Sequence, residues 1–298
     1  MEAKKNNYEL ITETIIQSLE RGDIPWNSPY IKRIPQNLFS GKAYRGINTL
    51  LLSSVSSQYQ AFATFNQFKD NGHSVKKGAK ALPLFFFSVI EKKDKKTGEV
   101  EDTFPMLKRY SIFRVEDTDC DVSQFLEVNT ATPTEIHAKI DRALSMFFAK
   151  TLIGLSQCAN SAYYSPSNDI VNVPSKENMK SIDEYYTTLF HEIAHASGAE
   201  NRLNRDLKAF DKDTHSYSFE ELVAEMTAAF MCNYFGIASA KQLENSAAYV
   251  KSWIKHLSSD VKLAYKAASK AQQACDWILE AMGETTCIFE EQTKAEAA

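Results

Sequence analysis

Apolar residues recur at helical spacing along much of the chain. The first such stretch predicts a helix over residues 8–21, with Ile11, Ile15 and Leu19 on one side. Gly22 follows it and is a typical helix end. Further helices are predicted over 62–71, 134–150, 181–197 and 218–230 and around Trp253 and Trp277.

Two apolar runs on either side of a charged stretch predict a β-hairpin. Residues 84–90 form a continuous apolar run typical of a buried strand, and residues 106–115 return as a second strand. Residues 91–101 between them are nearly all charged, and we expect them to form a solvated loop. A third, β-branched run at 169–174 ends in proline and predicts a strand whose edge is free to pair with an extended peptide.

The pattern changes in the middle of the chain, where residues 116–133 are acidic and polar. Short mixed segments precede this stretch, and mainly helical patterns follow it. We therefore predict an α+β protein of two domains. The first is a mixed α+β domain over 1–120, the second a mainly helical domain with a small sheet over 134–298, and residues 121–133 link them.

The composition is that of a globular protein. The 298 residues are 44% hydrophobic and 24% charged, and no run approaches the roughly 18 apolar residues of a membrane span. The first residues lack the apolar block of a signal peptide, and the five cysteines form no CxxC pair. We expect a cytoplasmic protein with reduced thiols and no membrane partner.

The net charge of −4 hides a basic segment. Between residues 30 and 90 there are 8 Lys and Arg residues but a single acidic residue, Asp70, and aromatic residues are interleaved with them. Such a segment is typical of a surface that follows a phosphate backbone and stacks bases. The first domain is therefore a candidate nucleic-acid-binding domain.

The predicted helix over 181–197 carries the sequence His-Glu-Ile-Ala-His. Both of its ends are indicated by the sequence, because Ser181 stands at a capping position before it and Gly198 is expected to form a left-handed cap after it. His191 and His195 lie one turn apart on one face and can share a metal ion, with Glu192 beside the open coordination position. This pattern predicts half of a catalytic zinc site, with Glu192 as the general base and Mn²⁺ as an alternative ion.

A third metal ligand is expected from the predicted helix over 218–230. Glu221 and Glu225 lie one turn apart beside its apolar arc, and like charges at this spacing repel unless a cation or a ligating histidine lies against them. The order Glu-x-x-x-acid after His-Glu-x-x-His resembles the gluzincin metallopeptidases. That resemblance implies Glu221 as the ligand and Glu225 as the residue that braces a histidine, with the reverse assignment as the alternative.

Other interpretations of these residues remain open from the sequence. Glu221 follows Ser218 by three residues and could complete a helix capping box. His191 and His195 could instead pack in a core. His215 could replace Glu221 as the third ligand, as in proteins similar to the SprT group, although its polar surroundings favour a solvated loop.

Several short motifs occur in both parts of the chain. In the first part they are 25–26, Asn37, 41–48, 64–67 and 75–78, and in the second part 191–195, 202–205 and 219–225. Together they resemble the ArdC-type plasmid antirestriction proteins, whose first domain binds single-stranded DNA and is shared with some plasmid primases and whose second domain is a zincin-like metallopeptidase. One departure is Phe62, where relatives commonly have tryptophan.

The resemblance implies a protein of conjugative plasmids that binds incoming single-stranded DNA and protects it from host restriction. Aromatic faces would stack on bases, and cationic side chains would contact phosphates. An alternative is that Trp26 and Tyr44 are core aromatics and that single lysines are merely solvated. The candidate DNA-binding residues are Trp26, Lys42, Tyr44, Arg45, Asn48, Gln67, Lys76, Lys77 and Lys80.

Three functions are compatible with these residues. The first is an antirestriction protein that binds single-stranded DNA and carries a zinc peptidase site directed at restriction enzymes or other DNA-bound proteins. The second is a non-proteolytic binder that protects DNA by occlusion and holds a structural metal. The third is a metal-dependent nuclease or primase accessory that uses its carboxylates to hold Mg²⁺, although histidine ligands favour zinc.

Overall fold

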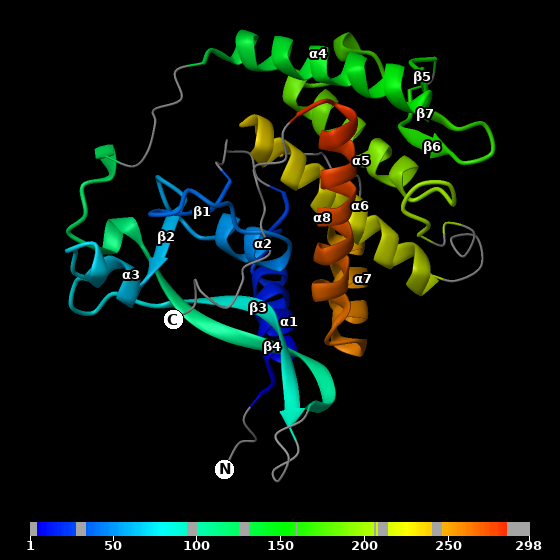
Figure 1. Ribbon diagram of the computed structural model, residues 1–298. Helices are drawn as coiled ribbons and strands as arrows, with labels where there is room; N and C mark the ends of the chain where they lie inside the picture. Colours follow the sequence, from blue (N-terminus) through cyan, green and yellow to red (C-terminus); the bar gives the residue numbers. More distant parts are fainter. Residues whose placement is uncertain are drawn as a thin grey trace.

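The computed structural model is an α+β protein, as the hydrophobic pattern predicts (Figure 1). It describes residues 5–27, 34–93, 100–124, 131–158, 160–205, 207, 214–239 and 246–284, with the backbone alone for 89–93, 101–105, 124, 214–218 and 246–249. The α-helices are α1 (Asn7–Glu20), α2 (Ile47–Ser53), α3 (Phe65–Asp70), α4 (Pro133–Thr151), α5 (Ile182–Ser197), α6 (Thr214–Phe235), α7 (Ser246–Ser259) and α8 (Leu263–Ala281). The strands are β1 (Gln36–Asn37), β2 (Ala61–Thr64), β3 (Leu82–Lys93), β4 (Val100–Arg114), β5 (Gly154–Ser156), β6 (Tyr163–Ser165) and β7 (Ile170–Asn172), and three short 3₁₀ turns are η1 (Val115–Asp117), η2 (Val122–Gln124) and η3 (Lys176–Asn178).

The helices begin where polar side chains cap them. Asn6 and Glu9 form a reciprocal capping box at the start of α1, whose buried residues include the predicted Ile11, Ile15 and Leu19. Helix α4 begins at Pro133, one residue before the predicted start at 134, and Thr132 is its capping residue. The helices predicted around Trp253 and Trp277 are α7 and α8, and residues 260–262 separate them.

The helix predicted over 62–71 is a strand followed by a helix. Thr64 accepts a hydrogen bond from the Gln67 backbone, and the Gln67 side chain accepts one from the Thr64 backbone, so the helix can begin only after Thr64. Phe62 therefore belongs to β2, where it lies opposite Arg114 of β4 and is fully buried. The four-stranded sheet has the order β1-β2-β4-β3.

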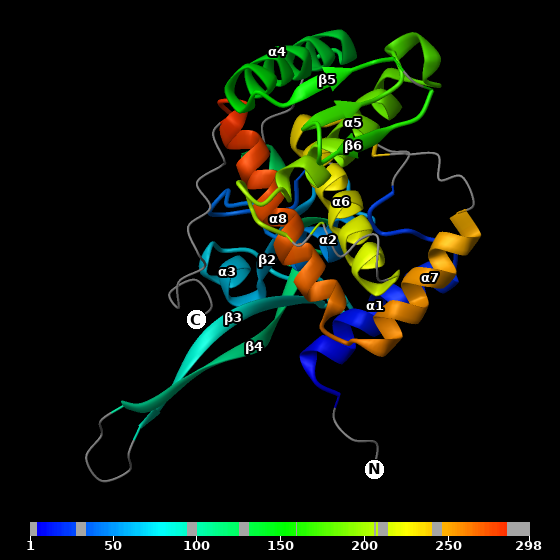
Figure 2. The same cartoon turned by 90° about the vertical axis from the view of Figure 1, so that its right-hand side faces the viewer.

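The β3–β4 hairpin is longer than predicted and forms an arm that projects from the body of the molecule (Figure 2). Its pairing continues from the apolar runs into the charged stretch as far as Lys93 and Val100. A ladder of backbone hydrogen bonds needs no apolar side chains, so charge alone did not end these strands. Residues 94–99, the rest of the predicted loop, lie outside the described residues.

A second, three-stranded sheet lies beside α5 and has the order β5-β7-β6. The strand predicted at 169–174 is β7, and it pairs in parallel with β5 and antiparallel with β6. The prediction of a free edge on this strand is wrong, because both of its edges are occupied by neighbouring strands.

One continuous core crosses the predicted domain boundary. Its buried side chains include Ile11, Trp26 and Leu50 from the first part and Phe190 and Leu222 from the second. The two sides of the predicted linker at 121–133 therefore share one hydrophobic core, and the domain boundary itself stays a prediction.

Helix α8 lies centrally in Figures 1 and 2 and packs against α1, α2, α4, α5, α6 and α7. Within the described ranges no helix combines the length and the apolar character that crossing a membrane requires.

Candidate metal centre

Helix α5 presents both predicted histidines to one point. Ser181 caps the helix by accepting a hydrogen bond from the Glu184 backbone, which agrees with the predicted start. The Nε2 atoms of His191 and His195 lie 3.1 Å apart, and their rings are 83° from coplanar. Both histidines sit near the end of a buried helix, so the helix and its packing limit their motion.

The end of α5 differs from the prediction. Gly198 is the C-terminal cap, but its φ of −78° is right-handed, so no left-handed cap forms. A glycine is needed here because there is no room for a side chain: a Cβ at this position would lie 2.9 Å from Nη2 of Arg205.

Helix α6 supplies a carboxylate that faces both imidazoles. The two oxygens of Glu221 lie 3.6 Å from the His191 Nε2 atom and 3.4 Å from the His195 Nε2 atom. Ligand atoms of these three residues lie within 4.8 Å of one another. We call His191, His195 and Glu221 the metal-centre set.

The metal-centre set fits a divalent ion. Two ligands of a tetrahedral zinc ion, each at about 2.1 Å, are separated by about 3.4 Å. The three measured separations of 3.1, 3.4 and 3.6 Å are close to that value. Two imidazoles and one carboxylate are also a donor set typical of catalytic zinc.

The two helices are held together by apolar packing on either side of these polar residues. Leu189 and Ile193 of α5 and Leu222 and Met226 of α6 are all buried in the same core. Helices α5 and α6 pack against each other. Burial of these side chains therefore fixes where Glu221 meets the histidines.

Two further glutamates contact the outer nitrogens of the histidines. Glu225 Oε1 lies 3.4 Å from the His191 Nδ1 atom, the ring that it is predicted to brace, but this nitrogen has no hydrogen-bond partner among the described residues. Glu220 Oε1 lies 3.4 Å from the His195 Nδ1 atom, a role that the sequence analysis missed. The available signal was its place directly before Glu221 in a Glu-Glu pair. Outer partners of this kind fix the orientation of a ligating imidazole.

The carboxylates favour positive charge at this point. Burial alone lowers the pKa of His195, but contacts with Glu220 and Glu221 and the charge of Glu192 outweigh burial and raise the pKa to about 10. Burial raises the pKa of Glu221, yet its contacts with His191 and His195 hold that pKa well below its usual range. The same electrostatics that hold a proton would attract a cation.

The remaining candidates near the site are partly outside the described residues. Glu192 is 5% exposed and close enough for its charge to raise the pKa of His195. The side chain of His215, the alternative third ligand, lies outside the described part of the chain. The structure therefore brings Glu221 to the histidines and does not test His215.

The two aromatic candidates for DNA stacking are core residues, the alternative that the sequence left open. Trp26 is 2% exposed and packs edge-on against Trp253, with ring centroids 5.1 Å apart. Tyr44 is 3% exposed and packs against Phe62. Neither ring offers a face to solvent, so neither can stack on a base in this structure.

Three polar candidates for DNA binding have structural partners. Arg45 forms an ion pair with Asp276 of α8. The Asn48 amide donates to the backbone oxygen of Phe85 and accepts from its backbone nitrogen. Gln67 caps α3, as described above. These residues join parts of the fold, and their side chains are engaged there.

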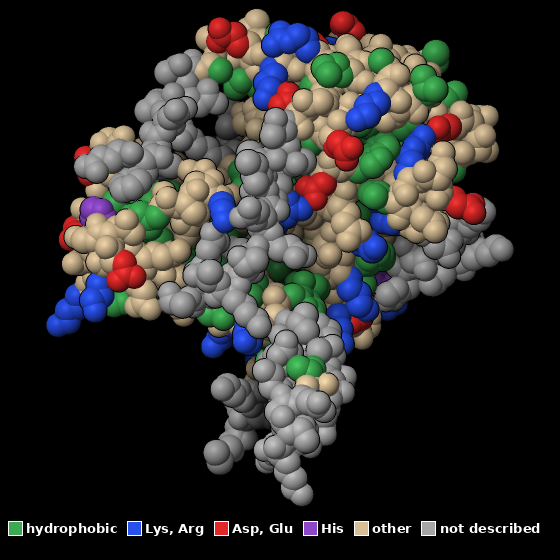
Figure 3. All heavy atoms as spheres, viewed as in Figure 1, with side chains coloured by type: hydrophobic (Ala, Val, Ile, Leu, Met, Phe, Trp, Pro, Cys, Tyr) green, Lys and Arg blue, Asp and Glu red, His purple; other side chains and the backbone are tan. Residues whose placement is uncertain are grey.

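The lysine candidates are more accessible. Lys76, Lys77 and Lys80 are exposed between α3 and β3, and Lys76 Nζ donates to the Glu116 backbone oxygen at 3.0 Å. Lys42 is half-buried. On the face seen in Figure 3, Lys and Arg side chains occur in small groups among acidic ones. Cationic side chains of the described residues on that face therefore occur in local groups and form no continuous patch.

Comparison with known proteins identifies the family. Residues 5–113 match the model for the N-terminal domain of anti-restriction factor ArdC, and residues 142–270 match a zincin-like metallopeptidase model. The crystal structure of the metal-free antirestriction protein ArdC from plasmid R388 superimposes with a TM-score of 0.77 at 33% identity, covering 94% of this chain and 98% of that one. The chain belongs to the ArdC antirestriction family. The Mn(II)-bound structure of the same R388 protein superimposes with a TM-score of 0.76 at 32% identity, covering 95% and 100%.

Three curated relatives show different extents of similarity. The uncharacterized protein y4eC of Sinorhizobium fredii is 31% identical over 292 residues, which is 91% of each chain. A DNA primase TraC of Escherichia coli is 29% identical over 295 residues, and a second is 30% identical over 293. The ArdC-family chain spans only 20% and 27% of the two primases, although it aligns over 94% and 93% of its own length.

Proposed function

We propose that this protein is an antirestriction protein of a conjugative plasmid that binds incoming single-stranded DNA and carries a zinc-dependent peptidase site. The convergence of His191, His195 and Glu221 on one point is the observation that carries the proposal. Membership of the ArdC family and the zincin-like domain support the same assignment. The Mn(II)-bound R388 relative supports a divalent cation at such a site and leaves Mn²⁺ as an alternative to zinc.

The metal-centre set would hold the ion, and it fits by distance and donor type. A bound divalent ion would supply Lewis acidity and lower the pKa of a water. Glu192 follows a ligand directly on α5 and is buried, so it is the residue we assign to accept a proton and return it to the leaving amine. Glu220 would hold the His195 imidazole in orientation through its Nδ1 atom, and Glu225 lies beside the Nδ1 atom of His191.

Exposed cationic side chains, and not aromatic rings, would make the contacts with DNA. Lys76, Lys77 and Lys80 occur within five residues of one another on a surface segment. Lysines on such a segment contact phosphates without reading sequence. Binding should therefore weaken as salt is raised, with little preference for base sequence.

The test compares wild type with Glu192→Ala and with Glu200→Ala, which removes an exposed carboxylate just beyond the same helix. Each protein is incubated with Zn²⁺, single-stranded DNA and restriction enzymes, and plasmid transfer into a restricting host is measured in parallel. Loss of cleavage and of protection in Glu192→Ala alone would support the proposal. Full protection by Glu192→Ala would replace it with occlusion by a non-proteolytic binder.

A further inference from the structure

Two arginines on the loop after α5 bind carbonyls of its last turn. Arg205 Nη2 donates to the Ala194 oxygen at 2.6 Å, and Arg202 Nη1 donates to the Ala196 oxygen at 2.8 Å. The last carbonyls of a helix lack partners within the helix, so these bonds complete its end. The two side chains are 5% and 7% exposed, respectively, which makes them a matched pair.

Arg205 also reaches the metal centre through Glu220. Its Nε donates to Glu220 Oε2 at 2.8 Å, and its Nη2 donates to Glu220 Oε1 at 2.7 Å. The same Oε1 lies 3.4 Å from the His195 Nδ1 atom. The Glu220 carboxylate is only 4% exposed, and burying a charged group destabilises the fold unless an opposite charge pairs with it. The two hydrogen bonds from Arg205 supply that charge and hold both carboxylate oxygens.

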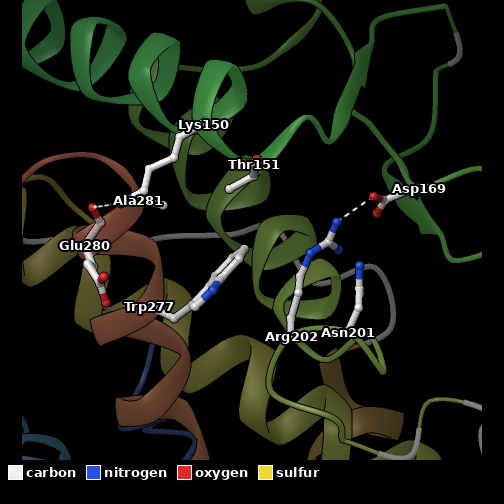
Figure 4. A pocket seen from close by; sticks show the side chains of 8 residues that line it. All are labelled: Lys150, Thr151, Asp169, Asn201, Arg202, Trp277, Glu280 and Ala281. Atoms are coloured by element: carbon white, nitrogen blue, oxygen red, sulfur yellow. Dashed lines mark hydrogen bonds and ion pairs between the residues drawn. The ribbon is translucent and has the colours of Figure 1, made fainter.

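Arg202 differs in what lies beyond it. It pairs with Asp169, which is 43% exposed, and its guanidinium lies 5.9 Å from the centre of the Trp277 ring. Figure 4 shows Arg202 pointing toward Asp169, and both residues line a pocket of about 340 Å³. Asp169 and Trp277 are not members of the metal-centre set.

The space for Arg205 is provided by Gly198. A Cβ there would lie 2.9 Å from Nη2 and 3.1 Å from Cζ of Arg205. The φ of Gly198 is −78°, which any residue can adopt, so backbone freedom does not explain the glycine. The guanidinium thus fills a place against α5 that any larger residue at 198 would crowd.

We infer that Arg205 is a positioning residue of the metal centre. It fixes the Glu220 carboxylate, and Glu220 orients the His195 imidazole so that its Nε2 atom faces His191 and Glu221. The inference rests on the metal site of the proposed function. Loss of an outer partner of a ligating histidine typically weakens metal binding 10- to 100-fold.

The test measures the affinity of the full chain for Zn²⁺ by chelator competition. We expect Arg205→Lys, which keeps the charge but loses the two-point contact, to bind Zn²⁺ roughly 10- to 100-fold more weakly. The matched Arg202→Lys variant should stay within about threefold of wild type, because both arginines bind the end of α5 but Asp169 and Trp277, the other partners of Arg202, lie outside the metal-centre set. The visible absorption of bound Co²⁺ should change only in Arg205→Lys, since it reports the geometry of the ligands.

A double-mutant cycle tests whether Arg205 acts through Glu220. In a Glu220→Gln background, Arg205→Lys should cost less than about threefold in Zn²⁺ affinity, because the carboxylate that it holds is already gone. An undiminished effect in that background, or equal losses in the Arg202 and Arg205 variants, would overturn the inference. Unfolding of each variant without metal is followed by circular dichroism, so that loss of fold is recognised.

A second variant covers the case in which Arg205→Lys does not fold. Gly198→Ala leaves Arg205 and Glu220 in place but crowds the guanidinium, and we expect weaker Zn²⁺ binding from it as well. Unchanged affinity in the folded Gly198→Ala protein would count against the inference. If wild type itself does not bind Zn²⁺, the proposed function fails too, whereas equal binding by wild type and Arg205→Lys removes only the role of Arg205.

Discussion

Replacement of Trp26 separates a core role from a DNA-stacking role. The ring is 2% exposed, lies edge-on to Trp253, and its Nε1 atom has no hydrogen-bond partner among the described residues. Removing a buried ring of this size costs about 3–5 kcal/mol, including about 0.5–1.5 kcal/mol for the aromatic pair. We therefore expect Trp26→Ala to lower the free energy of unfolding by about 3–5 kcal/mol.

The conservative Trp26→Phe variant should be far milder. It leaves a smaller cavity than alanine does. It also removes a buried N–H that makes no hydrogen bond, and this should stabilise the folded protein by about 1–3 kcal/mol. These terms oppose each other, so the free energy of unfolding should stay within about 1 kcal/mol of wild type. The midpoint and slope of denaturant unfolding measure both variants.

The DNA affinity of the same variants tests whether Trp26 stacks on a base. Fluorescence anisotropy with a labelled single-stranded oligonucleotide should show unchanged affinity for Trp26→Phe and for the folded fraction of Trp26→Ala. A stacking residue would instead lose about 1–3 kcal/mol per base, roughly a 5- to 150-fold rise in Kd. A Trp26→Ala protein that is as stable as wild type but binds DNA that weakly would refute the core assignment.

Three further outcomes are expected. Glu221→Ala should weaken Zn²⁺ binding by at least about 100-fold in calorimetry, and unchanged affinity would remove this residue from the ligand set. Glu192→Ala should retain Zn²⁺ but lose about 10²- to 10⁴-fold in peptide cleavage, and retained cleavage would contradict its role as base. Changing Lys76, Lys77 and Lys80 together to Ala should reduce the slope of log affinity against log salt by about 2 for single-stranded DNA, and an unaltered slope would place DNA elsewhere.

The local parts of the fold were predicted well because they depend on neighbouring residues. The apolar spacing of Ile11, Ile15 and Leu19 and the cap at Ser181 act within a few turns of helix, and both appear as predicted. The errors arose where a local pattern had two uses. Phe62 fits a helix pattern, yet the cap at Thr64 delays the helix and leaves Phe62 in a strand.

The motif of the first domain left two roles open in the sequence, and contacts far apart in the chain decide between them. An aromatic or cationic residue in a motif can serve a ligand or the fold, and its sequence neighbours do not tell which. Trp26 meets Trp253, and Arg45 meets Asp276, in both cases across more than 200 positions of the chain. Only the packing of α7 and α8 against the first part showed that these side chains are engaged within the protein.

By itself the sequence determined that His191, Glu192 and His195 share a helix, with both imidazoles on one face, because helical periodicity is set by the backbone over one turn. The tertiary structure decided which carboxylates meet them: Glu221 at the inner nitrogens, and Glu220 and Glu225 at the outer ones. All three lie within six residues on α6, so sequence distance could not rank them. The ranking follows from where α6 crosses α5, and burial of apolar side chains far apart in the chain sets that crossing.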